Sequence, residues 1–211
     1  MKSRYKIFRF ILYPLIYLAN FIQNNFSDFF TPMNMGSVSE KSYADFIKKN
    51  FNKNDYVLDF GSGAGFHSTL FDKNKYLGVE INKNFVLTSR KKYKNFKFKE
   101  LNKKCLSGYE KKITAIFINN VLHHLTDRQI EDTFIFFKKN LRSNTKLFII
   151  EPLLPYTFFS LEFVMKVLDI GDNIKTKDGY LKIIKNCFSV KKTRVRNHRL
   201  SHALVLNGFL K

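Results

Sequence analysis

Cysteine is scarce in this 211-residue chain, which has two cysteines, nine glycines, four prolines and no tryptophan. Cys105 and Cys187 lie far apart and belong to no CxxC or Cys/His cluster. This spacing argues against a disulfide framework or a zinc site, and it suits a reducing cytoplasm. The sequence also has no GxSxG, HExxH or P-loop motif, so the functions that depend on those motifs have no support.

Acidic residues are few as well, with 17 Asp and Glu against 37 Lys and Arg, which gives a formal net charge of +20. Such a charge favours nucleic acid or an anionic membrane as a partner. A simpler explanation competes with this one. The excess is in Lys (29, against 8 Arg), and it accompanies 20 Asn and only 5 Ala, as AT-rich codons would produce. The charge alone therefore does not identify a partner.

The first 36 residues form an apolar and basic N-terminal extension, which we separate from a domain over residues 37–211. Its apolar run over residues 7–22 is interrupted by Arg9 and Pro14. The run falls short of the roughly 20 apolar residues that cross a bilayer, and no signal-peptide cleavage site follows it. Two interpretations stay open: residues 1–30 lie on a membrane surface, or they form a lid over the active site. The expected location is the cytoplasm, with membrane association under the first interpretation.

The remaining 175 residues alternate between apolar runs and segments with helical periodicity. Expected strands cover residues 56–60, 76–81, 96–101, 113–118 and 146–150, and a closing antiparallel pair covers 189–196 and 202–210. Expected helices cover about 39–50, a segment starting near 64–66, 82–93, 126–141, 156–168 and a last one through 180–187. Strands that alternate with helices imply a parallel sheet with right-handed crossovers. We therefore predict an α/β fold with a mostly parallel seven-stranded sheet, a C-terminal antiparallel hairpin and helices on both faces.

The most informative segment is residues 57–65, Val-Leu-Asp-Phe-Gly-Ser-Gly-Ala-Gly. Its glycines allow a tight turn after the first strand and close approach of a ligand to the backbone. The spacing is GxGxG, whereas nicotinamide-binding folds use GxGxxG. Asp59, two residues before the first glycine, would repel a pyrophosphate but could pair with an ammonium group. S-adenosylmethionine (SAM) has such a group on its amino acid tail and has no phosphate.

A second acidic residue, Glu80, ends the second expected strand about 20 residues further on. A carboxylate at that place accepts hydrogen bonds from ribose hydroxyls in nucleoside-binding sheets. Helix capping or a solvated strand end would explain Asp59 or Glu80 taken singly. Both residues at this spacing favour a bound nucleoside with a positively charged tail.

Together, residues 57–65, 76–81, 113–125 and 147–151 resemble the successive motifs of the class I SAM-dependent methyltransferases. The likeness spans about residues 38–211, and residues 118–125 (Ile-Asn-Asn-Val-Leu-His-His-Leu) resemble the fourth-strand motif of the small-molecule branch. The resemblance implies a Rossmann-like fold, SAM as the cofactor and no metal. By position it implies cofactor contacts from Asp59, Gly61, Ser62, Gly63, Gly65, Glu80, Ile81, Asn102, Asn119 and Asn120.

Within that set, Ile81 would lie against the adenine, and Asn119 and Asn120 would border the methionine end. Asn102 is a departure, since the family usually has an acidic residue there that bonds the adenine amino group. The Asn102 side-chain carbonyl can still accept that hydrogen bond, so we expect weaker binding rather than none.

Methyl transfer from a sulfonium needs mainly positioning and desolvation, with a general base only if the acceptor carries a proton. His123 and His124 follow the fourth strand, where a histidine could take that proton near neutral pH. Packing or capping of the next helix is the alternative role for each. Glu151, which ends the fifth strand, is a candidate for substrate contact with the same alternative.

Three functions remain open from the sequence. The first is methylation of a small-molecule or lipid-like acceptor, the second is RNA methylation, and the third is a non-catalytic SAM-binding subunit. Basic residues near the C-terminus favour RNA: Lys191, Lys192, Arg194, Arg196 and Arg199. Against nucleic-acid methylation, no Asp/Asn-Pro-Pro-aromatic motif follows the fourth strand and no RNA-binding module is recognisable. No carboxylate cluster indicates a metal-dependent catechol enzyme.

Overall fold

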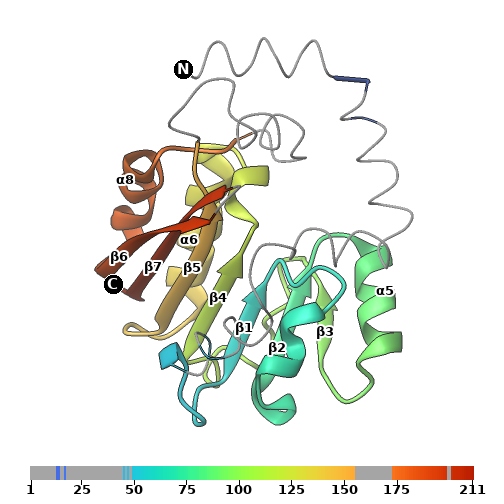
Figure 1. The fold of residues 1–211 in the computed structure, drawn as a ribbon. Coiled ribbons are helices and arrows are strands. Elements are labelled where there is room, and N and C mark those ends of the chain that lie inside the picture. Colours follow the sequence, from blue (N-terminus) through green and yellow to red (C-terminus); the bar gives the residue numbers. More distant parts are fainter. Residues whose placement is uncertain are drawn as a thin grey trace.

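The computed structural model describes residues 13, 14, 17, 45, 47, 49–154, 173–198 and 201–211. Within these residues a seven-stranded sheet forms the centre of the fold, in the order β3-β2-β1-β4-β5-β7-β6 (Figure 1). Its strands are β1 (Val57–Phe60), β2 (Tyr76–Glu80), β3 (Phe98–Glu100), β4 (Ala115–Asn119), β5 (Lys146–Pro152), β6 (Phe188–His198) and β7 (Ser201–Leu210).

The first five strands pair in parallel, and β7 pairs antiparallel with both β5 and β6. The predicted fold class, a mostly parallel seven-stranded sheet closed by an antiparallel hairpin, is therefore confirmed. β1 has β2 on one side and β4 on the other. The chain order thus reverses between β1 and β4, which is the place where open α/β sheets bind ligands at the carboxyl ends of their strands.

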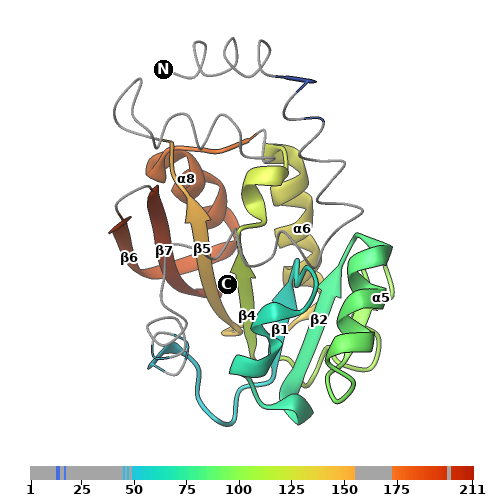
Figure 2. The same ribbon diagram turned by 45° about the vertical axis from the view of Figure 1, so that its right-hand side comes forward.

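Helices cover both faces of the sheet (Figure 2). The α-helices are α5 (Lys83–Lys92), α6 (Asp127–Asn140) and α8 (Lys177–Cys187), and the 3-10 helices are η1 (Phe66–Leu70), η2 (Lys73–Lys75) and η3 (Leu122–His124). On the face covered by α6 and α8, sheet residues such as Leu58 and Ile116 pack with Phe134 of α6. Val86 of α5 packs with Tyr76 on the other face.

Local sequence explains where the helices begin. Asn82 caps α5 by accepting from the backbone N–H groups of Asn84 and Phe85. Thr126 and Gln129 form the predicted capping box of α6. A capping side chain satisfies helix N–H groups that have no partner within the helix.

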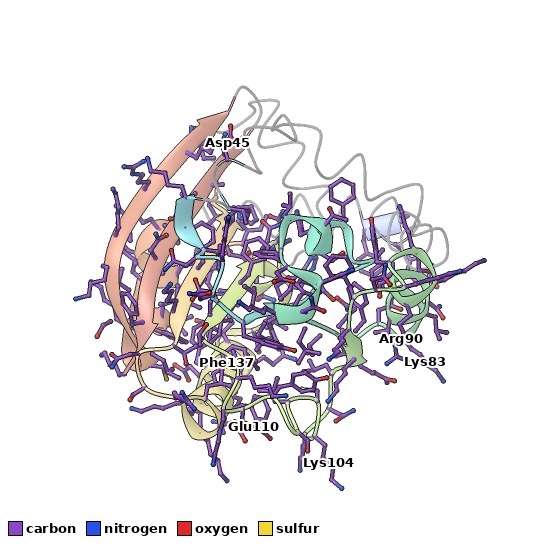
Figure 3. The ribbon with its side chains drawn as sticks, turned by 90° about the horizontal axis from the view of Figure 1, so that it is seen from below. Asp45, Lys83, Arg90, Lys104, Glu110 and Phe137 are labelled. Atoms are coloured by element: carbon purple, nitrogen blue, oxygen red, sulfur yellow. The ribbon has the colours of Figure 1, made fainter. Side chains whose placement is uncertain are left out.

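The amphipathic pattern of the last helix is also confirmed. Tyr180, Ile183, Ile184 and Cys187 of α8 are all buried. The end-on view in Figure 3 shows the same separation for other helices: Phe137 of α6 lies inside, whereas Lys83 and Arg90 of α5 lie at the periphery. Phe137 packs edge-on against Phe60, with ring centroids 5.1 Å apart.

Three expectations differ from the structure or lie outside the described residues. The helix expected to start near residues 64–66 is the short 3-10 helix η1, because the chain is already extended at Phe71, whose ring stacks on Tyr76. The helix expected over 39–50 is helical at the four of its residues that are described. The helix expected over 156–168 lies outside the described residues.

Most of the N-terminal extension also lies outside them, so its role as lid or membrane-surface helix stays a prediction. Tyr13, Pro14 and Tyr17 are helical, and the two tyrosine side chains are largely exposed. In the part of the chain that the structure describes, no helix is both long and apolar enough to cross a membrane.

Candidate functional site

Three strand ends meet at the centre of the candidate site. β1, β2 and β4 are parallel neighbours, so Phe60, Glu80 and Asn119 end their strands at the same edge of the sheet. The loops that follow these ends carry most of the residues that the sequence singled out. Parallel pairing therefore brings together segments that lie about 20 and 40 residues apart along the chain.

The glycine loop after β1 depends on backbone conformations that side chains disfavour. Gly61, Gly63 and Gly65 all have positive φ angles, of 76°, 53° and 81°. A Cβ on Gly61 would lie 2.3 Å from Val121 Cγ2, and one on Gly65 would lie 2.8 Å from the Phe98 ring. At Gly63 nothing lies within 4 Å of that position. The outer glycines thus allow close packing, while Gly63 leaves open space beside the loop.

The loop is fastened to the end of β2. The backbone N–H groups of Gly61 and Ser62 both donate to the Val79 carbonyl, at 2.8 and 3.1 Å. Glu80 Oε2 accepts from the Gly63 N–H at 2.9 Å, and Glu80 Oε1 accepts from the Asn82 N–H at 2.9 Å. A carboxylate offers about four acceptor positions, so Glu80 retains capacity for two further donors.

Two neighbouring side chains have the character that a nucleoside base requires. Ile81, directly after Glu80, is 73% exposed, which is unusual for so large an apolar side chain. Asn102 is exposed beyond β3, where its side-chain oxygen accepts from the Lys104 N–H at 2.8 Å. A carbonyl oxygen has two lone pairs, so one remains on Asn102 for a ligand.

Ser62 carries a buried hydroxyl without a hydrogen-bond partner. Among the described residues near this loop, the Ser62 Oγ and the Ser68 Oγ are the two buried hydroxyl oxygens without a hydrogen-bond partner. The Ser62 Oγ lies 2.9 Å from where a Cβ on Gly78 would be, so it faces the glycine of β2. An unpaired buried hydroxyl is costly, which makes Ser62 a site for a missing donor or acceptor.

Asp59 lies almost completely buried beneath the loop, with 2% of its surface exposed. Its Oδ2 accepts from the Tyr76 hydroxyl at 2.6 Å. Burial raises the pKa of the Asp59 carboxyl to about 7, the Tyr76 hydrogen bond lowers it, and the nearby charge of Glu80 raises it. Removal from water disfavours the ionised form of a carboxyl, which explains the direction of the largest effect.

The end of β4 is linked to η1 by two polar side chains. Asn119 Nδ2 lies 3.5 Å from His67 Nε2, and the His67 ring packs edge-on against Phe117 with centroids 5.7 Å apart. Burial lowers the pKa of His67 to about 4, so its imidazole is neutral near pH 7. Asn120 follows with a positive φ of 56° and donates its backbone N–H to the Ile150 carbonyl.

Glu151 fixes the turn after β4. It is fully buried, and Oε1 accepts from the N–H groups of Val121 and Leu122, each at 2.8 Å. Oε2 accepts from the His123 N–H at 3.3 Å and lies 2.9 Å from His123 Nδ1. Four hydrogen bonds fill the acceptor positions of a carboxylate. The expected substrate contact by Glu151 is therefore wrong, and the alternative, structural role is the one observed.

The two histidines differ in accessibility. His123 is 3% exposed, and because a carboxylate can only accept, its Nδ1 carries the proton in the bond to Glu151. The His124 side chain is exposed, and its ring centroid lies 4.0 Å from that of His123. Of the two predicted general bases, His124 is the one that an acceptor can reach directly.

Sequence reasoning missed two residues of this arrangement, Tyr76 and His67. Tyr76 alternates with Gly78 and Glu80 along β2, which puts the three on one face of a strand with period two. That alternation would have been a usable signal if the register between β1 and β2 had been known. No sequence signal would have distinguished His67.

The comparisons with known proteins agree with this geometry. Residues 58–149, somewhat less than half of the chain, match the model of a family described as a methyltransferase domain. The matched segment runs from β1 into β5 and so includes the ends of β1, β2 and β4. A search of curated proteins found no match to the sequence.

Solved methyltransferase structures share the fold over most of the chain. A SAM-dependent methyltransferase from Methanosarcina mazei is 13% identical, with a TM-score of 0.64, and the alignment covers 78% of this chain and 96% of that one. Magnesium protoporphyrin IX methyltransferase from Synechocystis PCC 6803, with bound SAH, is 18% identical, with a TM-score of 0.58 and 81% of each chain covered. Geranyl diphosphate C-methyltransferase from Streptomyces coelicolor A3(2) is 13% identical, with a TM-score of 0.61 over 82% of this chain and 81% of that one. At these identities the likeness shows that the chain shares its Rossmann-like fold with these methyltransferases.

The described part of the chain offers no site for a structural metal. The described residues contain no group of three or more His, Cys, Asp or Glu side chains that could hold an ion. Cys105 and Cys187 are both buried free thiols.

Proposed function

We propose that this protein is a methyltransferase that transfers the methyl group of SAM to a small-molecule or lipid-like acceptor. The observation that carries the proposal is the contact between the glycine loop and the acidic end of β2, where Glu80 accepts from the Gly63 N–H at 2.9 Å. This contact joins the open space beside Gly63 to a carboxylate with free acceptor positions.

The residues at this edge fit each part of the cofactor. Ribose hydroxyls would donate to Glu80, and the adenine would lie on the exposed side chain of Ile81. The Asn102 carbonyl would accept from the adenine amino group. The orphaned Ser62 hydroxyl would gain a partner in the amino acid tail, whose ammonium group would pair with Asp59. Gly61, Gly65, Asn119 and Asn120 would shape the walls.

SAM supplies a sulfonium whose methyl group is already a strong electrophile. The chain then has three tasks: to orient the acceptor in line with that methyl group, to exclude water, and to take a proton if the acceptor carries one. Neutral His67 near Asn119 adds no positive charge beside the sulfonium. The exposed His124 is the group that would take the acceptor's proton, while His123 is held by Glu151.

The class of acceptor is supported by fold neighbours whose named substrates are a porphyrin and geranyl diphosphate. The N-terminal extension, apolar and basic, would cover the acceptor or bring the enzyme to a membrane surface. Cytoplasmic location, with residues 1–30 in peripheral contact with a membrane, is part of the same proposal.

A second candidate, RNA methylation, is favoured by one observation. The edge strand β6 presents the exposed side chains of Lys191, Lys192 and Arg194. Contacts between such basic side chains and the phosphates of RNA weaken steeply as the salt concentration rises. Activity on RNA that falls by orders of magnitude between low and moderate salt would favour this candidate over a small-molecule acceptor.

The experiment that tests the function is transfer of labelled methyl groups from SAM into a cell extract, followed by separation into RNA, protein, lipid and small molecules. The proposal expects label in the lipid or small-molecule fraction. A Gly63→Asp, Glu80→Ala double variant, which places a carboxylate in the open space and removes another, should give no label.

An Asp72→Asn variant serves as the matched control, because Asp72 is an exposed acid that only caps η2. It should label like the wild type, and thermal melting should show that all variants are folded. Label in RNA would replace the main proposal with the second candidate. SAM binding without label in any fraction would indicate a non-catalytic subunit.

A further inference from the structure

Asp59 is almost completely buried, and aromatic residues lie beside it. Its neighbours across the sheet are Gly78 on β2 and Phe117 on β4. Phe71 packs against both the Tyr76 ring and the Phe117 ring, with centroids 5.7 and 5.6 Å away. The carboxyl group therefore lies in a low-dielectric environment, where a negative charge needs a partner.

Tyr76 is the one described side chain that donates to Asp59. Its ring is fixed by Phe71, which stacks on it, and by edge-on contacts with Phe96 and Phe98 at 5.5 and 5.7 Å. Tyr76 itself is completely buried, and burial together with Asp59 raises the pKa of its hydroxyl well above the ordinary value. The hydroxyl therefore stays protonated and points its proton at Asp59.

Few charged or titratable groups lie around Asp59 and Tyr76 in the part of the chain that the structure describes. β2 contributes Glu80, whose charge raises the pKa of Asp59. η1 contributes His67, which packs on Phe117 and is neutral above about pH 4. Tyr93, after α5, acts on Tyr76 but not directly on Asp59. No described cation lies in this set, so a ligand cation would be the first partner for an Asp59 charge.

We propose that Tyr76 is a positioning residue for cofactor binding, whose hydroxyl holds the Asp59 carboxyl so that arrival of a ligand ammonium group expels the Asp59 proton to solvent. The proposal rests on the proposed function, since the ammonium group is that of SAM. In the step, the carboxylic acid loses its proton to water, and the carboxylate forms an ion pair with the ammonium group. No other bond changes.

The loss of one proton from Asp59 on binding has two measurable consequences. Binding at pH 7 should release about half a proton, because a group that titrates at about 7 is half protonated there. Below pH 7 the affinity should fall by about tenfold per pH unit, since each complex requires removal of one proton. The ligand remains positively charged throughout, because α-amino groups titrate at about pH 8.

Isothermal titration with SAM between pH 5 and 7, in buffers of different ionisation enthalpy, measures the affinity and the number of protons released on binding. Tyr76→Phe removes a hydrogen bond to the charged form of Asp59, which should raise the pKa of that carboxyl by about one unit, to above the pH range of the titrations. At pH 7 this variant should bind about fivefold more weakly and yet release about 0.9 proton instead of half a proton. A merely structural role for Tyr76 would weaken binding without increasing proton release.

Three controls make the result decisive. Asp59→Asn should bind SAM more weakly, without proton release and with no change in affinity between pH 5 and 7. Tyr56→Phe removes the hydroxyl of a tyrosine that directly precedes β1 and packs against Tyr109, away from Asp59, and it should behave as the wild type. The ligand 5′-methylthioadenosine, which lacks the amino acid tail, should release no proton from any variant.

The proposal is overturned if the wild type binds SAM without proton release, or if Tyr76→Phe releases no more protons at pH 7 than the wild type does. Absence of a SAM site, which would defeat the proposed function itself, has a different signature. In that case neither SAM nor 5′-methylthioadenosine binds at any pH, although the protein is folded.

Discussion

Asp59 and His67 should give opposite and nearly cancelling pH dependences of stability in the ligand-free protein. Burial raises the pKa of Asp59 from 3.8 to about 7, so the fold prefers this carboxyl protonated. The stabilising contribution of the protonated form is complete below pH 3.8 and is lost as the pH rises to about 7. A shift of about three units corresponds to about 4 kcal/mol in the free energy of unfolding.

For His67 the sign is reversed. Burial lowers its pKa from 6.5 to about 4, so the fold prefers the neutral imidazole. This stabilising contribution is complete above pH 6.5 and is lost as the pH falls to about 4, by about 3 kcal/mol in total. Between pH 4 and 6.5 the slopes from the two residues therefore cancel in the wild type.

Single substitutions should uncover each slope separately. Asp59→Asn leaves His67 unopposed, so its free energy of unfolding should fall by about 3 kcal/mol from pH 6.5 to 4. His67→Gln leaves Asp59 unopposed, so its stability should rise over the same change. Urea denaturation at half-unit pH intervals measures both, and differences from the wild type remove contributions shared by all variants. Parallel profiles for the wild type and both variants would refute the assigned burial effects.

Two further predictions concern the loops of the site. Gly61→Ala should lower the free energy of unfolding by about 2 kcal/mol or more, because the residue has a positive φ and the added Cβ would clash with Val121. Gly63→Ala should lower it by about 1 kcal/mol, because open space lies beside this residue, and should mainly weaken SAM binding. Thermal melting with and without SAM separates the two. Glu151→Gln puts an amide N–H₂ among four donors, so it should cost about 3 kcal/mol or more in urea denaturation, and equal stability would contradict the buried-cap role.

Much of the fold was predictable because it follows from local signals. The central strands β1, β2, β4 and β5 are short and mostly apolar runs. The starts of α5 and α6 follow from side chains at Asn82 and Thr126 that satisfy nearby N–H groups. The helix after the glycine loop was not predictable in this way. Phe71 leaves helical conformation to pack against Tyr76 and Phe117, and that competition depends on distant residues.

The site was predictable in location but not in its hydrogen bonds. A GxGxG loop and an acid at the next strand end place a ligand at one edge of the sheet from sequence alone. The Tyr76 contact to Asp59 required the register of β1 on β2, in which Asp59 is opposite Gly78. Gly78 has no side chain to crowd Asp59 on the face that the two residues share. A shift of the β1–β2 register by one residue would place the Tyr76 side chain on the opposite face of the sheet from Asp59.

The three strand-end acids show why residue type alone does not assign a role. Asp59, Glu80 and Glu151 each follow an apolar run, and from sequence each was a candidate for ligand contact. Their bonds differ: one hydroxyl donates to Asp59, two backbone N–H groups to Glu80, and four donors to Glu151. Since a carboxylate accepts about four hydrogen bonds, only the first two retain capacity for a ligand. Burial then separates those two, because Asp59 is 2% exposed and Glu80 is 9% exposed. The nearly inaccessible Asp59 carboxyl has a raised pKa, so it binds a cation at the expense of its own proton.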